Sequence, residues 1–355
     1  MDKINLLISS YNLNYGGIEK SLLNFINNLD LNLFNITVVL EKKEGVFLDR
    51  VNKDIKILEY KPSKSKFINM FKRIKWLMKH KNKYDVSICY ATYSLPANFI
   101  ARTGSKKRIF YVHSDYCELY KRDINKIKEF FDVRFLNEYQ KIIFVSNESK
   151  ENLINIYPDI KDKGLVINNN VDINEIIEKS KEECSTNLYN KNIGIFVGRL
   201  DEDSKRISVL LDLAKKCQEN DKDIGFLIVG DGPDRGKTED FINKERLNNV
   251  KVLGAQENPY KYMRKSNFLI VCSRYEGYPV VYSEAIVLGK PILTTLDITD
   301  DKISINNNFG IVSSDEELYD NLDKILKFEN RSVDFDQINK ERINKVQELI
   351  KELSK

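Results

Sequence analysis

Two glutamates separated by seven residues, in the segment EGYPVVYSE, have the types and spacing to bind a polar ligand. Glu276 precedes Gly277 and Pro279, and Glu284 closes the segment. Proline is tolerated at the first position of a helix. We therefore expect a helix from about Pro279, with Glu276 in the preceding loop and Glu284 about one and a half turns inside. Free backbone N–H groups at a helix start bind phosphate or sugar oxygens. The alternative interpretation is that the segment is only a helix start, with acidic residues that complement the helix dipole and a glutamate on the surface.

Basic residues follow a second apolar run. Arg199 comes after Gly198 at the end of the predicted strand Ile193–Val197, and Lys205 and Arg206 lie a few residues further on. Fixed positive charge stabilises a diphosphate leaving group without a metal ion. Ordinary surface charge on a polar loop is the alternative interpretation.

The first half of the chain has two more candidates. Gly16 and Gly17 follow the first predicted strand, and glycine lets a backbone approach a ligand closely. His113 ends another predicted strand, where polar side chains of parallel sheets contact ligands. A simple turn and a structural histidine are the alternatives. Neither the Gly16–Gly17 loop nor residues 230–236 complete the G-x-G-x-x-G dinucleotide fingerprint, which disfavours hydride transfer.

Short apolar strands alternating with helices must position these residues. Such alternation predicts parallel sheets covered on both faces. The pattern restarts near residue 193, and we expect two doubly wound halves. A charged amphipathic helix ends the chain. The predicted domains are residues 1–170, 171–335 and 336–355, the last being a helix that crosses back to the first domain. The predicted strands are 4–9, 36–40, 86–90, 108–112, 141–145, 193–197, 226–229, 250–253, 268–271 and 291–294.

Composition fits this organisation. A chain of 355 residues suits two domains, 42% hydrophobic residues supply their cores, and a net charge of +4 by itself implies no polyanionic partner. No apolar run reaches the roughly 18 residues of a spanning helix. The first residues suggest a strand and not a signal peptide. Five scattered cysteines without a CxxC pair favour a reducing cytoplasm.

The segment 61–83 is strongly basic. It carries nine Lys or Arg and no acidic residue, and its apolar residues recur at helical spacing. A basic amphipathic helix can lie on an anionic membrane surface. The alternative is a helix that packs its apolar face on the core, and nucleic-acid binding is disfavoured because no such motif accompanies the charge. The candidate membrane-surface residues are Lys72, Arg73, Lys75, Trp76 and Lys79.

Together these motifs resemble a known family. The segments GGIEK, VHSD, VGRL, IVGDGPDR and EGYPVVYSEAIVLGKPILTT resemble the retaining glycosyltransferases of family 4, group 1, which have the GT-B fold. The matches run from residue 4 to about residue 312. The family fold implies two Rossmann-like domains that face each other across a cleft, with acceptor bound mainly to the first domain and donor mainly to the second. NNNVD resembles the family's N-G-V-D turn, with Asn169 in place of glycine.

The resemblance also implies roles for particular residues. Arg199 and Lys205 would neutralise the donor diphosphate, Glu276 would bind hydroxyls of the transferred sugar, and His113 would approach that sugar from the first domain. The family spacing from arginine to lysine is one residue shorter, so either Lys205 or Arg206 could fill the second role. Glu284 would bind the nucleotide ribose. The implied donor-binding residues are Gly16, Gly17, Gly198, Gly277, Tyr278, Pro279 and Glu284.

The expected activity is retaining, metal-independent transfer of a sugar from a nucleotide diphosphate-sugar, UDP-sugars being favoured, to an acceptor hydroxyl. The acceptor would be a saccharide or lipid-linked saccharide of a bacterial surface polysaccharide or glycolipid, with the enzyme at the inner face of the cell membrane. No cofactor is expected, because no DxD-type pair follows a strand; Asp300 and Asp301 lie in a later loop. A nucleotide-sugar epimerase, a phosphorylase and a non-catalytic partner subunit are the alternatives.

Overall fold

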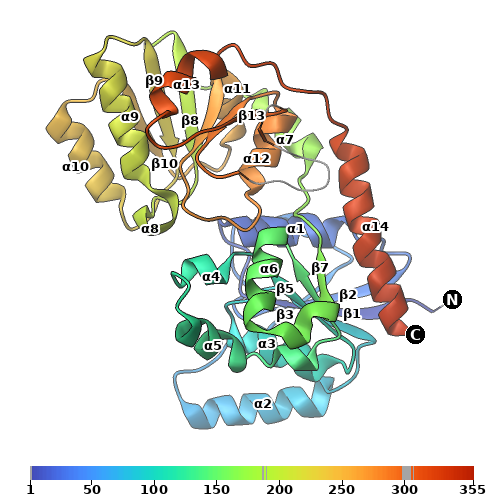
Figure 1. Cartoon of the computed structure of the whole chain (residues 1–355). Coiled ribbons are helices and arrows are strands. Elements are labelled where there is room, and N and C mark those ends of the chain that lie inside the picture. The colour runs from blue at the N-terminus through green and yellow to red at the C-terminus, as the bar shows by residue number, and fades with distance from the viewer. Residues whose placement is uncertain (1, 186–187, 189, 298–304, 307) are drawn as a thin grey trace. The chain divides into compact units, whose positions relative to one another are not determined.

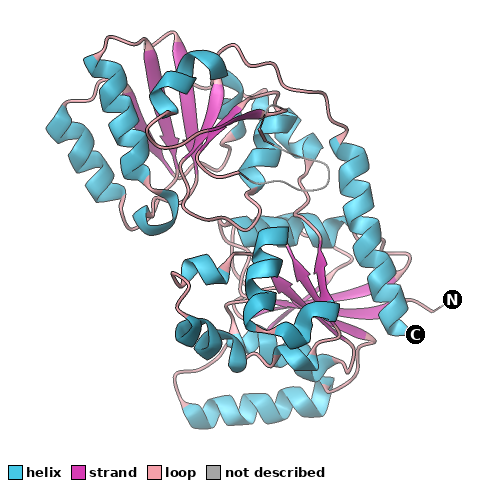
Figure 2. Ribbon diagram, in the orientation of Figure 1, coloured by secondary structure: helices cyan, strands magenta, loops and turns pink. Residues whose placement is uncertain are grey.

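The chain folds into two compact units in a computed structural model that describes residues 2–185, 188, 190–297, 305–306 and 308–355. The first unit comprises Met1–Asn170 and Asn339–Lys355, and the second comprises Val171–Ile338 (Figure 1). Each unit has a parallel sheet with helices packed against it (Figure 2). The fold class is therefore as predicted: α/β, with two Rossmann-like domains.

The first unit contains a seven-stranded parallel sheet in the order β3-β2-β1-β4-β5-β6-β7. Its central strands are almost entirely buried, because apolar helices cover both faces. The strands are β1 (Ile4–Ser10), β2 (Phe34–Leu40), β3 (Lys56–Glu59), β4 (Val86–Cys89), β5 (Arg108–Val112), β6 (Lys141–Phe144) and β7 (Gly164–Val166). The helices are α1 (Gly17–Asn28), α2 (Lys66–His80), α3 (Leu95–Gly104), α4 (Tyr116–Leu119), α5 (Ile124–Asp132) and α6 (Asn147–Ile156).

The second unit contains a six-stranded parallel sheet in the order β10-β9-β8-β11-β12-β13. This is the strand order of the Rossmann fold. The strands are β8 (Asn192–Val197), β9 (Ile224–Val229), β10 (Val250–Gly254), β11 (Phe268–Val271), β12 (Ile292–Thr294) and β13 (Gly310–Val312). The helices are α7 (Ile173–Ser180), α8 (Glu202–Lys205), α9 (Ile207–Glu219), α10 (Arg235–Glu245), α11 (Tyr260–Lys265), α12 (Val280–Val287) and α13 (Leu318–Ile325).

The last helix, α14 (Phe335–Ser354), completes the core of the first unit. Ile343, Val346 and Ile350 are buried in the same apolar cluster as β1 and β2. The side-chain oxygen of Gln347 accepts a hydrogen bond of 2.8 Å from the backbone N–H of Asp30. Residues from the end of the chain thus stabilise the sheet with which the chain begins.

No helix in the described part of the chain is long and apolar enough to span a bilayer.

Candidate active site

The predicted site residues of the second unit follow the carboxyl ends of two neighbouring central strands. β8 pairs with β11. On one side of this pair the sheet continues with β9 and β10, and on the other side with β12 and β13, so the strand order reverses here. In doubly wound sheets, ligands bind at the carboxyl ends of the strands at this switch point. Gly198 and Arg199 follow β8, and the loop with Glu276 follows β11. The fold therefore brings together two motifs that lie more than seventy residues apart in the sequence.

An ion pair joins the two motifs. The Lys205 ammonium, at the end of α8, contacts the Glu276 carboxylate, and both side chains are largely shielded from water. The same carboxylate oxygen accepts a hydrogen bond of 2.7 Å from the Ser273 hydroxyl. A charged hydrogen bond in such a partly buried position is stronger than one between neutral groups. Lys205 and Glu276 are thus held together at the carboxyl ends of the central strands, where an anionic ligand could compete with Glu276 for the lysine.

Arg206, unlike Lys205, donates hydrogen bonds to three separate segments of the second unit. Its backbone is left-handed, with φ of +47°, and it links α8 to α9. Its guanidinium donates to the Cys272 carbonyl at 2.7 Å, the Thr295 hydroxyl at 2.6 Å and the Asp315 carboxylate at 2.7 Å. These bonds tie the start of α9 to the segments that follow β11, β12 and β13. The guanidinium is therefore engaged within the protein, whereas Lys205 faces the site.

We expect Lys205→Ala and Arg206→Ala to separate activity from stability. Lys205→Ala should remove most turnover and lower the melting temperature less than Arg206→Ala does, because the Ser273 hydroxyl still donates to the Glu276 carboxylate. Arg206→Ala should lower the free energy of unfolding by about 2 kcal/mol or more, because it removes the donor to the buried Cys272 carbonyl and to the half-buried Thr295 hydroxyl. Thermal melting and a transfer assay on both variants measure the two effects. A stable but inactive Arg206→Ala would instead assign the ligand-binding role to Arg206.

The Arg199 loop rests on a glycine-rich neighbour. The Arg199 side chain is 70% exposed, with the Asp201 carboxylate 4.0 Å away. Below it, a Cβ atom on Gly230 would lie 1.8 Å from the Gly198 carbonyl oxygen, and the Gly198 N–H donates to Val229 at 3.0 Å. From the sequence, this segment was used only for the family resemblance and as an incomplete dinucleotide motif, and its packing against Gly198 was missed. The signal was present, because two glycines after one strand permit close backbone packing on the next.

Helix α12 begins where its sequence indicates. Pro279 is the N-cap with extended backbone, and within the described residues no side chain hydrogen-bonds to the helix start as a cap. Gly277 and Tyr278 before it are buried. Glu284 is also buried and accepts a hydrogen bond of 3.1 Å from the Tyr260 hydroxyl. The alternative of a surface glutamate is therefore wrong for Glu284, because the residue lies on the covered face of α12.

A second polar cluster lies in the first unit, at the carboxyl ends of the paired strands β1 and β4. Gly16 caps α1, and Glu19 folds back so that a Cβ on Gly16 would lie 2.0 Å from its carboxylate. Glu19 accepts a hydrogen bond of 2.8 Å from the Tyr93 hydroxyl, and burial raises the pKa of its carboxyl. Gly17 borders open space. Glu19 and Tyr93 were missed by sequence analysis, although Glu19 stands within GGIEK.

His113 follows β5 and is buried between aromatic rings. Its ring centroid lies 4.4 Å from that of Tyr90 and 5.3 Å from that of Tyr111. Burial lowers the pKa of His113 to about 3, so the imidazole is neutral near pH 7. Neither ring nitrogen has a partner in hydrogen-bonding geometry among the described residues. Buried polar atoms are normally paired, which makes this histidine unusual among the buried groups that the structure describes.

One predicted membrane-surface residue is not on the surface. Trp76 is buried in a cluster with Leu7, Val39 and Ile100, and its indole N–H donates to the Thr103 hydroxyl at 2.9 Å. The prediction for Trp76 was wrong because its position on α2 faces the sheet. Of the four basic candidates, Arg73, Lys75 and Lys79 are exposed, whereas Lys72 is half-buried and donates a hydrogen bond to the Lys61 carbonyl at 2.6 Å.

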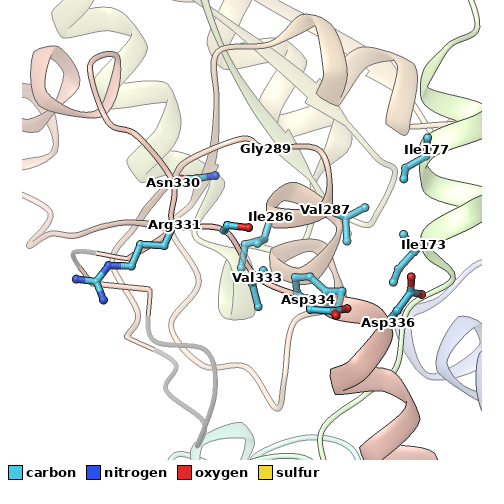
Figure 3. A pocket seen from close by; sticks show the side chains of 12 residues that line it. Ile173, Ile177, Ile286, Val287, Gly289, Asn330, Arg331, Val333, Asp334 and Asp336 are labelled. Atoms are coloured by element: carbon cyan, nitrogen blue, oxygen red, sulfur yellow. The ribbon is translucent and has the colours of Figure 1, made fainter.

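A cavity of about 570 Å³ opens elsewhere in the second unit (Figure 3). It lies beside α7, at the carboxyl end of α12, whereas the predicted donor site lies at the amino end of that helix. Helix rise separates the two ends by about 12 Å. None of the predicted site residues lines it. Its lining residues are Ile173, Ile177, Ile286, Val287, Gly289 and residues 330–336.

No cluster of three or more His, Cys, Asp or Glu side chains that could hold a metal ion exists within the part of the chain that the structure describes. Asp300 and Asp301 lie outside the described residues.

Comparisons with known proteins agree with this architecture. A family model described as Glycosyltransferase Family 4 matches residues 15–175, and one described as Glycosyl transferases group 1 matches residues 177–342. The crystal structure of the Anabaena protein HepE in complex with UDP and glucose has a similar fold, with a TM-score of 0.75 at 15% identity over 97% of this chain and 99% of that chain.

Curated relatives are similar in sequence. An uncharacterised glycosyltransferase of Methanocaldococcus jannaschii is 27% identical over 92% of this chain and 88% of its own length. The poly(ribitol-phosphate) alpha-N-acetylglucosaminyltransferase of Staphylococcus aureus is 24% identical over 71% of this chain and 50% of its own length. The first three curated relatives are matched over 49%, 88% and 50% of their own lengths. With two family models that together span nearly the whole chain and a matching fold, this chain belongs to the group 1 glycosyltransferases of family 4.

Proposed function

We propose that the chain transfers a sugar from a UDP-sugar to an acceptor hydroxyl with retention of configuration. The observation that carries the proposal is the Lys205–Glu276 pair at the β8–β11 switch point, beside the exposed Arg199. The HepE complex with UDP and glucose supports a uridine donor. Donors of this kind combine a diphosphate, which needs cations, with a sugar, whose hydroxyls need acceptors.

Each residue would act on the part of the donor that matches its chemistry. Lys205 would exchange its ion pair with Glu276 for one with the diphosphate, and Arg199 would contact the same diphosphate. Both cations would then stabilise the negative charge that develops on the leaving group. The freed Glu276 carboxylate would accept hydrogen bonds from the transferred sugar. The N–H groups at the start of α12 would bind phosphate oxygens. Glu284 would bind the ribose after exchanging its bond with Tyr260.

Retention is proposed on chemical grounds. The S. aureus relative is named an alpha-transferase, which is the outcome of retention from an alpha-configured donor. The residues of the second-unit site are proposed to bind the donor, and none of them to attack its anomeric carbon. We therefore propose same-face substitution, in which the departing phosphate takes the acceptor proton. His113, Gly16 and Gly17 would contact substrate from the first unit, His113 as a neutral hydrogen-bonding group.

The acceptor is proposed to be a saccharide or lipid-linked saccharide of a surface polysaccharide. Poly(ribitol-phosphate), in the name of one relative, is a polyol-phosphate polymer that likewise offers hydroxyl groups as acceptors. The enzyme would work in the cytoplasm, at the inner face of the membrane where such acceptors are assembled, without a nucleic-acid partner.

Thermal-shift screening against UDP-, GDP- and ADP-sugars tests the donor. A ligand at a hundred times its Kd stabilises the native state by about 2.7 kcal/mol. We expect UDP-sugars to raise the melting temperature most. Free UDP should then appear only when an acceptor is supplied; interconversion of sugars without UDP release would identify an epimerase. Binding of no sugar nucleotide would favour a non-catalytic subunit.

Chelation tests the metal-free mechanism. Because Arg199 and Lys205 are proposed to supply the charge that Mg²⁺ or Mn²⁺ supplies elsewhere, activity in excess EDTA should stay within about twofold of the untreated rate. The assay is UDP release before and after chelation. Complete loss that added metal restores would contradict this part of the proposal.

A further inference from the structure

Helix α2 turns its apolar side away from the protein. Phe67, Phe71 and Met78 are 76%, 65% and 81% exposed, and Met70 and Ile74 are 49% and 46% exposed. Isolated exposed apolar residues are ordinary, but these five share one side of a short helix, whereas Ile68, 48% exposed, lies outside that side. In Figure 1, α2 lies along the outer edge of the first unit.

This apolar stripe lies on the side of α2 opposite to the side that packs against the first unit. At about 100° per residue, the five exposed side chains fall within an arc of about 100°, and Trp76 lies about 180° from its centre. The helix is fixed to the unit by that other side, through the Trp76–Thr103 hydrogen bond and the cation–π contact of Arg73 with Phe99 at 5.3 Å. A surface helix normally packs its apolar stripe on the core. Here the stripe is available to something outside the unit.

The positive charge around the apolar stripe indicates what kind of partner covers it. The segment 61–83 carries nine Lys or Arg and no acidic residue. Exposed Lys66, Lys75 and Lys79 flank the apolar arc, and their stems can extend along apolar surface while the ammonium groups stay in water. A second copy of this chain would bring like charges together. Nucleic acid would pair with the cations but leave the phenylalanines and methionines in water.

We propose that α2 docks on an anionic lipid bilayer, lying in its plane with Phe67, Met70, Phe71, Ile74 and Met78 inserted at the headgroup boundary. Each basic residue near anionic lipid adds attraction that salt weakens, whereas the inserted stripe adds attraction that salt does not remove. The inference deepens the proposed function, because a lipid-linked acceptor would be presented at the same surface. It does not depend on catalysis, since the contact surface is separate from the residues assigned to the donor.

Co-sedimentation of the full chain with vesicles tests the docking. The vesicles are phosphatidylcholine alone or mixed with phosphatidylglycerol, at low salt and at about 0.5 M salt, where the Debye length is about 4 Å. We expect binding only to the anionic vesicles at low salt, with a bound fraction that persists at high salt. F67S/M78S should lower the high-salt partition coefficient at least about tenfold. The control V46S/I177S, which removes two exposed apolar side chains on other elements, should bind like the unmodified chain.

Several outcomes would overturn the proposal. These are absence of sedimentation with anionic vesicles at low salt, loss of all binding at high salt, and equal binding by F67S/M78S and the control. A salt-sensitive shift of RNA without vesicle binding would assign the segment to nucleic acid instead. The thermal shift by UDP-sugars should be the same in every variant, so failure of docking is distinguishable from failure of the proposed transferase function.

Discussion

Glu276→Gln and Arg199→Ala are each expected to lower kcat at least about 10²-fold while the protein stays folded. Glu276→Gln removes the charge that pairs with Lys205 and that is proposed to accept hydrogen bonds from the sugar hydroxyls, and Arg199→Ala removes a cation that is proposed to stabilise the leaving group. Because Arg199 is 70% exposed, its loss should leave the melting temperature within about one degree. UDP release with saturating donor measures the first effect, and thermal melting measures the second.

Matched variants make this result specific. Lys251→Ala removes an exposed cation from β10, and Glu219→Gln neutralises an exposed carboxylate at the end of α9. Both lie in the second unit, outside the proposed site, and both should keep full activity. Near-normal turnover of Glu276→Gln and Arg199→Ala would show that the site has been placed wrongly.

Gly230→Ala should have the largest structural effect. The backbone of Gly230 has φ of +151°, which side chains disfavour, and a Cβ would lie 1.8 Å from the Gly198 carbonyl oxygen. Backbone strain and overpacking cost about 1–3 kcal/mol each, so we expect a loss of about 2–6 kcal/mol in the free energy of unfolding. The displaced Gly198–Arg199 backbone should also lower activity in whatever fraction remains folded. Denaturant unfolding and the transfer assay measure both effects.

Gly236→Ala is the matched control for that change. Gly236 lies inside α10, and a Cβ there would have no neighbour within 4 Å. Alanine should stabilise this helix by about 0.5–1 kcal/mol. A Gly230→Ala protein that melts like Gly236→Ala would contradict the close packing of the two loops.

Most strands that the sequence predicts are buried on both faces, and the exception is the edge strand β10. Runs such as ITVVL and FLIVCS can be recognised because apolar residues are continuous. The strands that were missed, β3, β7 and β13, are edge strands of their sheets, short and partly exposed. An edge strand pairs on one side only and needs less apolar sequence. Its existence therefore depends on the sheet and not on its own residues.

The orientation of α2 could not be predicted for a related reason. Periodicity gives the width of an apolar stripe but not the direction in which the folded protein turns it. Trp76 is the decisive residue, because one large aromatic side chain with a hydrogen bond to Thr103 holds the opposite face against α3. Sequence analysis placed Trp76 with the surface lysines, and the structure places it in the core.

The positions of the candidate site residues were predictable where a motif stands next to a recognisable strand. Arg199 and Glu276 each follow such a strand. The separate tasks of Lys205 and Arg206 were not predictable, because they depend on partners far along the chain: Glu276 for Lys205, and Thr295 and Asp315 for Arg206. Glu19 and Tyr93 meet in the same way, across two paired strands.

Hydrogen exchange of the full chain with and without UDP, in EDTA, tests the central claim most directly. Ligand bound at the second-unit switch point should slow exchange of backbone amides in two segments, 198–206 and 273–284, which contain Arg199, Lys205, Glu276 and the start of α12. The Arg199→Ala protein should show weaker protection of both segments at the same UDP concentration. Protection confined to other segments, or protection that appears only when Mg²⁺ is present, would contradict the account.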